Sequence, residues 1–94
     1  MNDIAFTAHA EERIQQRGIP PVVIDLLMQF GSASRSDGAE RLMFDKLAGK
    51  RLRRHLGGDR GLKVLERWLN VYAVIGDNGQ VVTAAHKHRH FYRD

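Results

Sequence analysis

The N-terminal segment "HAEERIQQRG" places three nitrogen-bearing side chains, those of His9, Arg13 and Arg17, at intervals of four residues. An α-helix turns by about 100° per residue, so these three side chains would form a row along one side of a helix. Ala10 and Ile14 form the neighbouring apolar row. The polar row therefore borders the predicted core, where long side chains bury their stems and direct their charged groups into an adjacent cleft.

These residue types suit metal-independent cleavage of RNA through its 2′-hydroxyl group. That reaction needs a base near the hydroxyl, an acid near the leaving oxygen and cations around the phosphorus centre. His9 is the candidate base, because the charge of Arg13 one turn away disfavours a protonated imidazole, and His86 is the candidate acid. Arg13 and Arg17 are candidate stabilisers of the developing negative charge, and Tyr72 is predicted to orient the substrate or stack on a base.

The same helix also has a purely structural interpretation. Arginines at the edge of a core commonly cover apolar surface or pair with carboxylates, and Glu12 and Asp25 are available for such pairs. A boundary histidine is commonly held by a neighbouring polar group. For this helix taken alone, the structural interpretation is favoured over a catalytic site.

The C-terminal stretch "HKHRHF" contains a second group of candidate residues. In an extended strand His86, His88 and His90 would share one face, and Lys87 and Arg89, which are candidate nucleic-acid contacts, would share the other. Three histidines on one face are weak candidates for a zinc, nickel or copper site. Because this strand has no carboxylate to complete a ligand set, we predict a solvated, titratable tail and no cofactor.

Two helices are predicted before any strand. Thr7 suits the N-cap of a helix from Ala8 to Arg17, and Gly18 suits the left-handed residue that ends it. The segment "PPVVIDLLMQF" has prolines suited to a first turn and apolar residues at helical spacing, which predicts a core helix that ends at Gly31.

Two hairpins and a third helix complete the pattern. "SASRS" and "AERLMFDK" flank a "DG" turn, and "GDNG" joins a strand predicted from about Leu65 to Ile75 with "QVVTAAHKHRHF". Between the hairpins, "KLAGKRLRRHL" has a thin apolar stripe typical of a surface helix, followed by Gly57 and Gly58. The order ααββαββ predicts a single α+β domain over residues 1–94, with helices packed on a small antiparallel sheet in two layers.

Charge favours a polyanionic partner. The 94 residues include 15 lysines and arginines against 11 acids, a net charge of +4, and five of the cations fall between Lys46 and Arg54 with no acid among them. We therefore expect RNA, another polyanion or an acidic protein as the partner. The predicted nucleic-acid contacts in this basic segment are Lys50, Arg51, Arg53 and Arg54.

Three features that the sequence lacks indicate the cellular compartment. There is no cysteine, the N-terminus has no basic stretch that leads into an apolar one, and the apolar runs are too short to span a bilayer. We expect a cytoplasmic protein that does not bind a membrane.

The segment "HAEERIQQRGIP", followed by an apolar helix and a hairpin that ends in "VVTAAHKHR", resembles the bacterial domain-of-unknown-function family 4258. The specific part of the resemblance is the N-terminal pattern, and Val82, Thr83 and His86 carry a more generic part at the end of the chain. That family is distantly similar to the RelE and BrnT type toxins, small basic ribonucleases that pair with antitoxins. The N-terminal pattern is carried by His9, Arg13, Arg17, Gly18 and Ile19.

Three hypotheses of function follow. The first is an RNA-directed protein, as the resemblance also implies, which acts as a metal-independent endoribonuclease through His9, Arg13, Arg17 and His86. The second is a non-catalytic module that uses the same cations to bind nucleic acid or an acidic partner protein such as an antitoxin. The third, a structural or metal-buffering protein, rests on the histidine tail alone.

Overall fold

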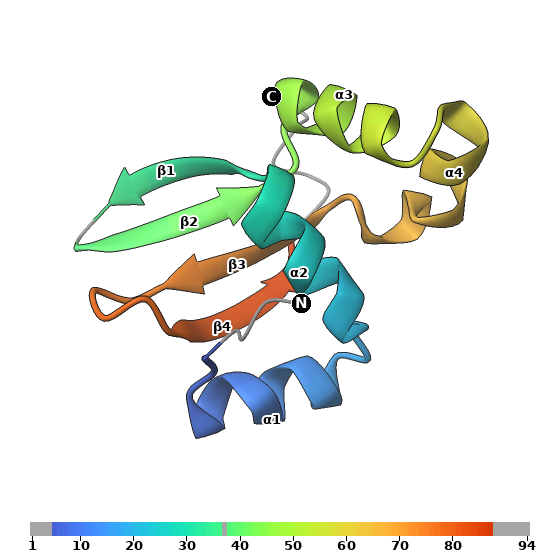
Figure 1. The fold of residues 1–94 in the computed structure, drawn as a ribbon. Coiled ribbons are helices and arrows are strands. Elements are labelled where there is room, and N and C mark those ends of the chain that lie inside the picture. The colour runs from blue at the N-terminus through green and yellow to red at the C-terminus, as the bar shows by residue number, and fades with distance from the viewer. Residues whose placement is uncertain (1–4, 37, 88–94) are drawn as a thin grey trace.

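The computed structural model describes residues 5–36 and 38–87 and shows an α+β fold, as predicted. Two helices precede a β-hairpin, three short helical segments follow it, and a second hairpin completes the sheet (Figure 1). The elements are α1 (Ala8–Gln16), α2 (Pro21–Phe30), β1 (Ser32–Ser36), β2 (Ala39–Met43), α3 (Lys46–His55), α4 (Asp59–Val64), η1 (Glu66–Trp68), β3 (Val71–Ile75) and β4 (Val81–His86).

The first helix begins at Ala8, as predicted, and ends at Gln16, one residue before the predicted end. Thr7 has an extended backbone, and its hydroxyl accepts a hydrogen bond of 3.0 Å from the Ala10 amide. Gly18, with φ of 61°, takes the left-handed conformation that lets the chain leave the helix. Ala10 and Ile14 are buried. The amphipathic pattern therefore places α1 correctly against the core.

The second helix is the centre of the core. Pro21 occupies its first turn, and Val23, Ile24 and Leu27 are almost completely buried. Gly31 follows the helix with an extended backbone, and a Cβ atom at this position would lie 2.6 Å from the Leu27 carbonyl oxygen. Glycine is needed there because the chain passes close to the helix as it turns into β1.

The four strands form one antiparallel sheet in the order β1-β2-β3-β4. The last pair contains an irregularity, because Val74 pairs with Thr83 while Ile75 pairs with Val81, which leaves Val82 as an extra residue in β4. The edge of β4 is covered at its start, where Thr7 donates a hydrogen bond to the Val81 carbonyl and Val81 donates one to the Ala5 carbonyl. Phe6 and Val81 thus form a short parallel bridge.

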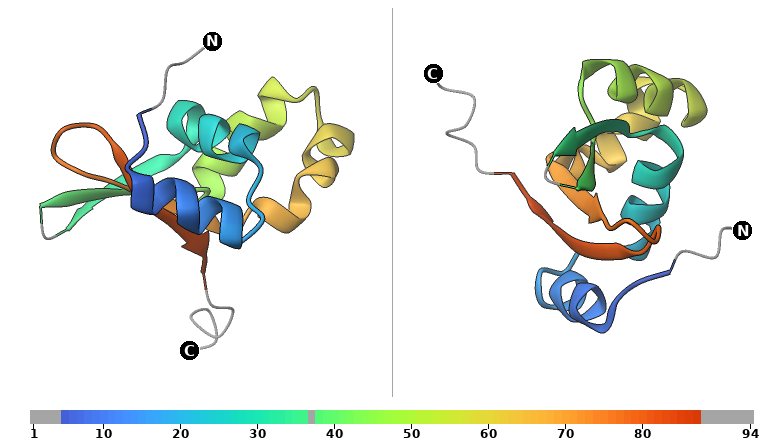
Figure 2. Two further views of the ribbon diagram at one scale, coloured as in Figure 1. Left: turned by 90° about the horizontal axis from the view of Figure 1, so that it is seen from below. Right: turned by 90° about the vertical axis from the view of Figure 1, so that its left-hand side faces the viewer.

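The helices are arranged unevenly around this sheet. α2 packs against β2 and β3, α1 packs along β4, and α3 packs on α2 (Figure 2). Alternate residues of β3, Val71, Ala73 and Ile75, are buried beneath the helices. Tyr72 and Val74 point to the opposite face and are only half-buried, and none of the described helices lies across that face.

The segment between the hairpins differs from the prediction. The region predicted as a strand from Leu65 contains the C-cap residue of α4, the 3-10 helix η1 and a turn, and β3 begins only at Val71. α4 was missed because its short sequence contains Gly61. A Cβ atom on Gly61 would lie 2.5 Å from the Leu56 carbonyl oxygen, so glycine allows α4 to fold back against the end of α3.

Of the helices in the part of the chain that the structure describes, none is both long and apolar enough to cross a membrane.

Candidate nucleic-acid interface

The predicted row on α1 exists, but only its last member reaches the sheet. Arg13 Nε donates a hydrogen bond of 3.3 Å to His9 Nε2 on the exposed surface of the helix. Arg17, the C-cap residue, donates from Nη1 to the carbonyl oxygen of Ala84 at 2.7 Å. Arg17 therefore binds the outer edge of β4, while His9 and Arg13 bind each other.

The direction of α1 separates the two predicted catalytic histidines. The helix starts beside Val81, where Thr7 is bonded to the strand, and finishes beside Ala84 (Figure 1). His9 precedes Arg17 by two turns, or about 12 Å along the axis at about 1.5 Å per residue. His86 follows Ala84 at the far end of the strand. The structure thus brings Arg17 towards the segment that contains His86 and leaves His9 nearer the opposite end of β4.

His86 is held by groups that the sequence did not indicate. Its Nδ1 lies 2.8 Å from Oδ1 of Asn70, the residue that precedes β3. Its ring is half-buried beside that of Trp68, with 5.7 Å between the ring centroids. The guanidinium of Arg67 lies 5.6 Å from the Trp68 ring centre. A histidine, a tryptophan and an arginine are therefore gathered where β3 begins and β4 ends.

A second aromatic residue lies nearby on the other face of the sheet. Tyr72 pairs with Ala85 across the β3–β4 ladder, and the guanidinium of Arg41 lies 4.9 Å from the Tyr72 ring centre. Lys87 reaches across this face, and its ammonium nitrogen lies 3.9 Å from the Met43 sulfur. Arg41 and Tyr72 come from neighbouring strands, so their contact depends on strand register.

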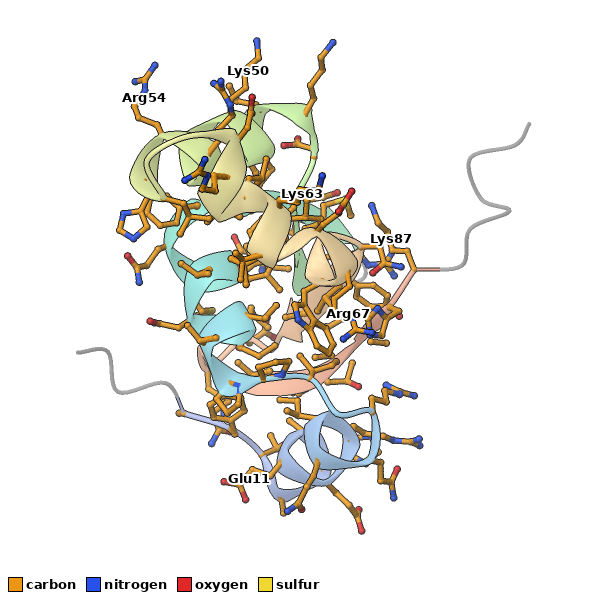
Figure 3. All side chains as sticks on the ribbon, turned by 90° about the vertical axis from the view of Figure 1, so that its right-hand side faces the viewer. Glu11, Lys50, Arg54, Lys63, Arg67 and Lys87 are labelled. Atoms are coloured by element: carbon orange, nitrogen blue, oxygen red, sulfur yellow. The ribbon has the colours of Figure 1, made fainter. Side chains whose placement is uncertain are left out.

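We use the name strand-end surface for the group of residues, from both faces of the sheet, that lies where β3 begins and β4 ends. Figure 3 shows Arg67 and Lys87 on the same side of the molecule. Of its members, Tyr72, His86 and Lys87 were predicted site residues, whereas Arg67, Trp68 and Asn70 were not. The only sequence signal for the missed residues is the position of "ERWLN" directly before β3. The strand-end surface consists of Arg67, Trp68, Asn70, Tyr72, His86 and Lys87.

The basic helix α3 forms a separate cationic area. Lys50 and Arg54 are exposed and project from α3, away from Arg67 and Lys87 (Figure 3). The other two predicted contacts are engaged within the protein. Arg51 donates a hydrogen bond of 3.1 Å to the Phe30 carbonyl oxygen.

Arg53 forms an exposed ion pair with Asp59, the first residue of α4. The hydrogen bond and the charge of the Arg53 guanidinium lower the pKa of the Asp59 carboxyl group below its ordinary value. Because this pair joins α3 to α4, Arg53 has a structural partner that Lys50 and Arg54 do not have among the described residues.

Most of the weak candidates for metal ligands lie outside the part of the chain that the structure describes. His88 and His90, like the predicted contact Arg89, are outside the described residues. Across residues 5–36 and 38–87, no three histidine, cysteine or acidic side chains are grouped closely enough to hold a metal ion. The described partners of His86 are an amide and an indole ring, and neither is a metal ligand.

An open hollow beside α1 has the wrong lining for a phosphate site. Phe6, Ile14 and Ile19 give it an apolar wall, and Glu11 adds a negative charge. None of the predicted catalytic residues contributes to this lining. We therefore base the site on the strand-end surface.

Comparisons of the chain with protein-family models, with curated proteins and with solved structures found no match.

Proposed function

We propose that the protein binds single-stranded RNA through the strand-end surface, without catalysis as its primary role. The observation that supports this proposal best is that two aromatic rings, one on η1 and one on β3, each lie beside a guanidinium group. Arg67 lies over Trp68, and Arg41 lies over Tyr72. Rings and guanidinium planes both stack on unpaired bases, and the positive charges attract the phosphate backbone.

Charge and topology support the same proposal. The chain has a net charge of +4, and Lys87 lies next to His86 at the end of the edge strand. An antiparallel sheet with one face free of described helices presents residues from several strands to an extended ligand. Bases must be unstacked to reach side chains such as Tyr72, so single-stranded RNA suits this surface better than a duplex.

RNA and an acidic protein partner can be distinguished by how strongly the affinity depends on the Tyr72 ring. Base stacking on an aromatic side chain contributes about 1–3 kcal/mol, or about 5- to 150-fold in affinity. An acidic protein such as an antitoxin would be bound chiefly through charge, and α3 would then contribute at least as much as Tyr72. RNA binding is expected to be sensitive to both the ring and the charge.

The test is the affinity of a labelled single-stranded RNA measured by fluorescence anisotropy. Tyr72→Leu should weaken binding within the range given above, whereas Tyr72→Phe keeps the ring and should bind almost as well as the wild type. Arg67→Gln should also weaken binding, and Arg54→Gln on α3 is its matched control. Equal affinities for the wild type and Tyr72→Leu would reject the strand-end surface as the binding site.

An endoribonuclease is the second candidate, and it is favoured by the way in which His86 is held. Asn70 contacts one ring nitrogen of His86 and leaves the other for a substrate proton. Arg17 uses Nη1 on the Ala84 carbonyl, two residues before His86, and its guanidinium has further donors for a phosphate. Catalysis at this end of β4 would thus use Arg17 and His86.

The cleavage test uses a single-stranded RNA with a chelator present, because the proposed reaction needs no metal ion. His86→Ala should abolish cleavage if this end of β4 is the site. His9→Ala should abolish it if the N-terminal row supplies the base, as the sequence predicted. If the RNA stays intact after incubation with the wild type, the nuclease hypothesis is rejected and RNA binding remains the proposed function.

A further inference from the structure

We propose that Asn70 is a positioning residue that fixes the tautomer of His86, and that Nε2 of His86 then recognises the 2′-hydroxyl group of RNA. This inference rests on the proposed function and deepens it, because it specifies why RNA would be bound in preference to DNA. The inference concerns which nitrogen of the His86 ring carries the proton, and this can be measured without any ligand.

The orientation of the Asn70 amide is set from both sides. Its Nδ2 donates a hydrogen bond of 3.5 Å to the Lys87 carbonyl oxygen, and the Lys87 amide donates one of 2.8 Å to the Asn70 backbone carbonyl. With the amide nitrogen directed to Lys87, the amide oxygen faces His86 at 2.8 Å from Nδ1. Asn70 is thus bonded to both of the last two described residues of the chain.

An amide oxygen can only accept a hydrogen bond, so Nδ1 of His86 must carry the proton in this contact. In a neutral imidazole only one nitrogen is protonated, and Nε2 is then an acceptor. This is the opposite of the tautomer that an unrestrained histidine side chain prefers. Asn70 therefore changes what His86 can recognise.

The free nitrogen lies in a suitable place for a ribose. Within residues 5–36 and 38–87, no hydrogen bond engages Nε2 of His86. The ring is half-buried beside Trp68, which restricts its rotation, and Lys87 follows it directly with a positive charge. A ribose hydroxyl group that approaches this ring can donate to Nε2, whereas the Lys87 side chain points to the other face of the strand. Deoxyribose lacks that hydroxyl.

The tautomer is tested first, by a long-range ¹H–¹⁵N correlation spectrum of the full chain in slightly alkaline buffer. The expected spectrum shows a protonated Nδ1 and an unprotonated Nε2 for His86. Asn70→Leu should shift the ring towards the Nε2-protonated form, and Asn70→Asp, which keeps an acceptor oxygen, should restore the wild-type pattern. A wild-type His86 protonated on Nε2 would overturn the proposal.

Ligand discrimination is tested with an oligouridylate and a deoxyuridine oligomer of the same length, which differ only in the 2′-hydroxyl groups. One hydrogen bond predicts a preference for RNA of about 2- to 10-fold in the wild type. His86→Phe keeps a ring beside Trp68 but has no acceptor, so it should bind both oligomers equally. His55→Phe, a histidine beside the Phe30 ring, is the matched control and should keep the preference.

The outcomes separate this inference from the function on which it rests. Equal affinity of the wild type for both oligomers, together with binding that depends on Tyr72, would reject the 2′-hydroxyl contact and leave RNA binding intact. Absence of binding to either oligomer would reject both the proposed function and its ligand contact. The NMR result for Asn70→Leu would then still decide whether Asn70 positions His86.

Discussion

Arg17, at the end of α1, donates a hydrogen bond of 2.7 Å to the carbonyl oxygen of Ala84, 67 residues later in the chain. The bond attaches the first helix to the outer edge of the last strand, close to the segment that carries His86. An unpaired strand edge is a site where other chains can add, and Arg17 occupies an acceptor on that edge. The positive side chain thereby both protects β4 and brings charge to the strand-end surface.

We predict that Arg17→Gln lowers the free energy of unfolding by about 1 kcal/mol, because a hydrogen bond from α1 to the sheet is lost. Arg13→Gln is the matched control. Among the described residues Arg13 bonds to His9 alone, on the surface of the same helix, so its replacement should change stability by less than about 0.5 kcal/mol. Urea unfolding followed by circular dichroism measures both effects. Equal costs for the two variants would show that the bond to Ala84 contributes nothing specific.

Thr7→Ala should destabilise the protein by about 1 kcal/mol, since the Ala10 amide loses its capping oxygen at the start of α1. Ser34→Ala, on the exposed strand β1, removes a hydroxyl that caps no helix and should have little effect. Thermal unfolding of the two variants would measure the difference. A loss of stability in Ser34→Ala as large as that in Thr7→Ala would contradict the capping role.

The lowered pKa of the Asp45 carboxyl group predicts that the stability of the folded protein depends on pH. Hydrogen bonds from the Ser32 hydroxyl and the Ala48 amide lower the pKa of this carboxyl group below its ordinary value of 3.8. The charged form is therefore favoured in the folded state, and its contribution to stability is present above pH 3.8 and is lost as the pH falls through the lower folded pKa.

Asp45→Asn should accordingly reduce the melting temperature at neutral pH and reduce it much less in strong acid. Asp77→Asn serves as the control, because within the described part of the chain Asp77 forms an exposed ion pair with Arg35 at 3.6 Å. A constant difference between Asp45→Asn and the wild type across the pH range would contradict the assigned cause.

The salt dependence of RNA binding distinguishes the strand-end surface from α3. Each phosphate contact to a single strand contributes about 0.7 to the slope of log affinity against log salt. With a short oligomer, Lys87→Gln should reduce the slope by about that amount, whereas Lys50→Gln should leave it unchanged. The reverse result would assign the phosphate contacts to α3, which the sequence had also predicted to bind nucleic acid.

Local signals in the sequence were sufficient for most elements of the fold. Thr7 marks the start of a helix through its capping hydroxyl, Gly18 and Pro21 mark helix ends through their backbone preferences, and glycines mark the two hairpin turns in the same way. The missed helix α4 depends on a tertiary contact. Gly61 indicates a break when read locally, but it sits inside a helix because the Leu56 carbonyl approaches it closely.

The site was harder to predict than the helices and strands, because it depends on the register of the strands and on the direction of α1. Periodicity identified the row of His9, Arg13 and Arg17, but it carries no information about which end of α1 meets which end of β4. The contact between His86 and Asn70 arises because Val71 pairs with His86, which places Asn70 opposite Lys87. A turn residue before a strand has no distinguishing pattern of its own, so Asn70 could not be recognised from the sequence.

The binding site itself is tested most directly by a ¹H–¹⁵N titration of the labelled wild-type protein with an oligouridylate. We expect the largest shift changes at the backbone amides of Trp68, Tyr72, His86 and Lys87 and at the Trp68 indole, with small changes along α3. Changes confined to the amides of Lys50 and Arg54, or a spectrum that does not change at saturating RNA, would contradict binding at the strand-end surface.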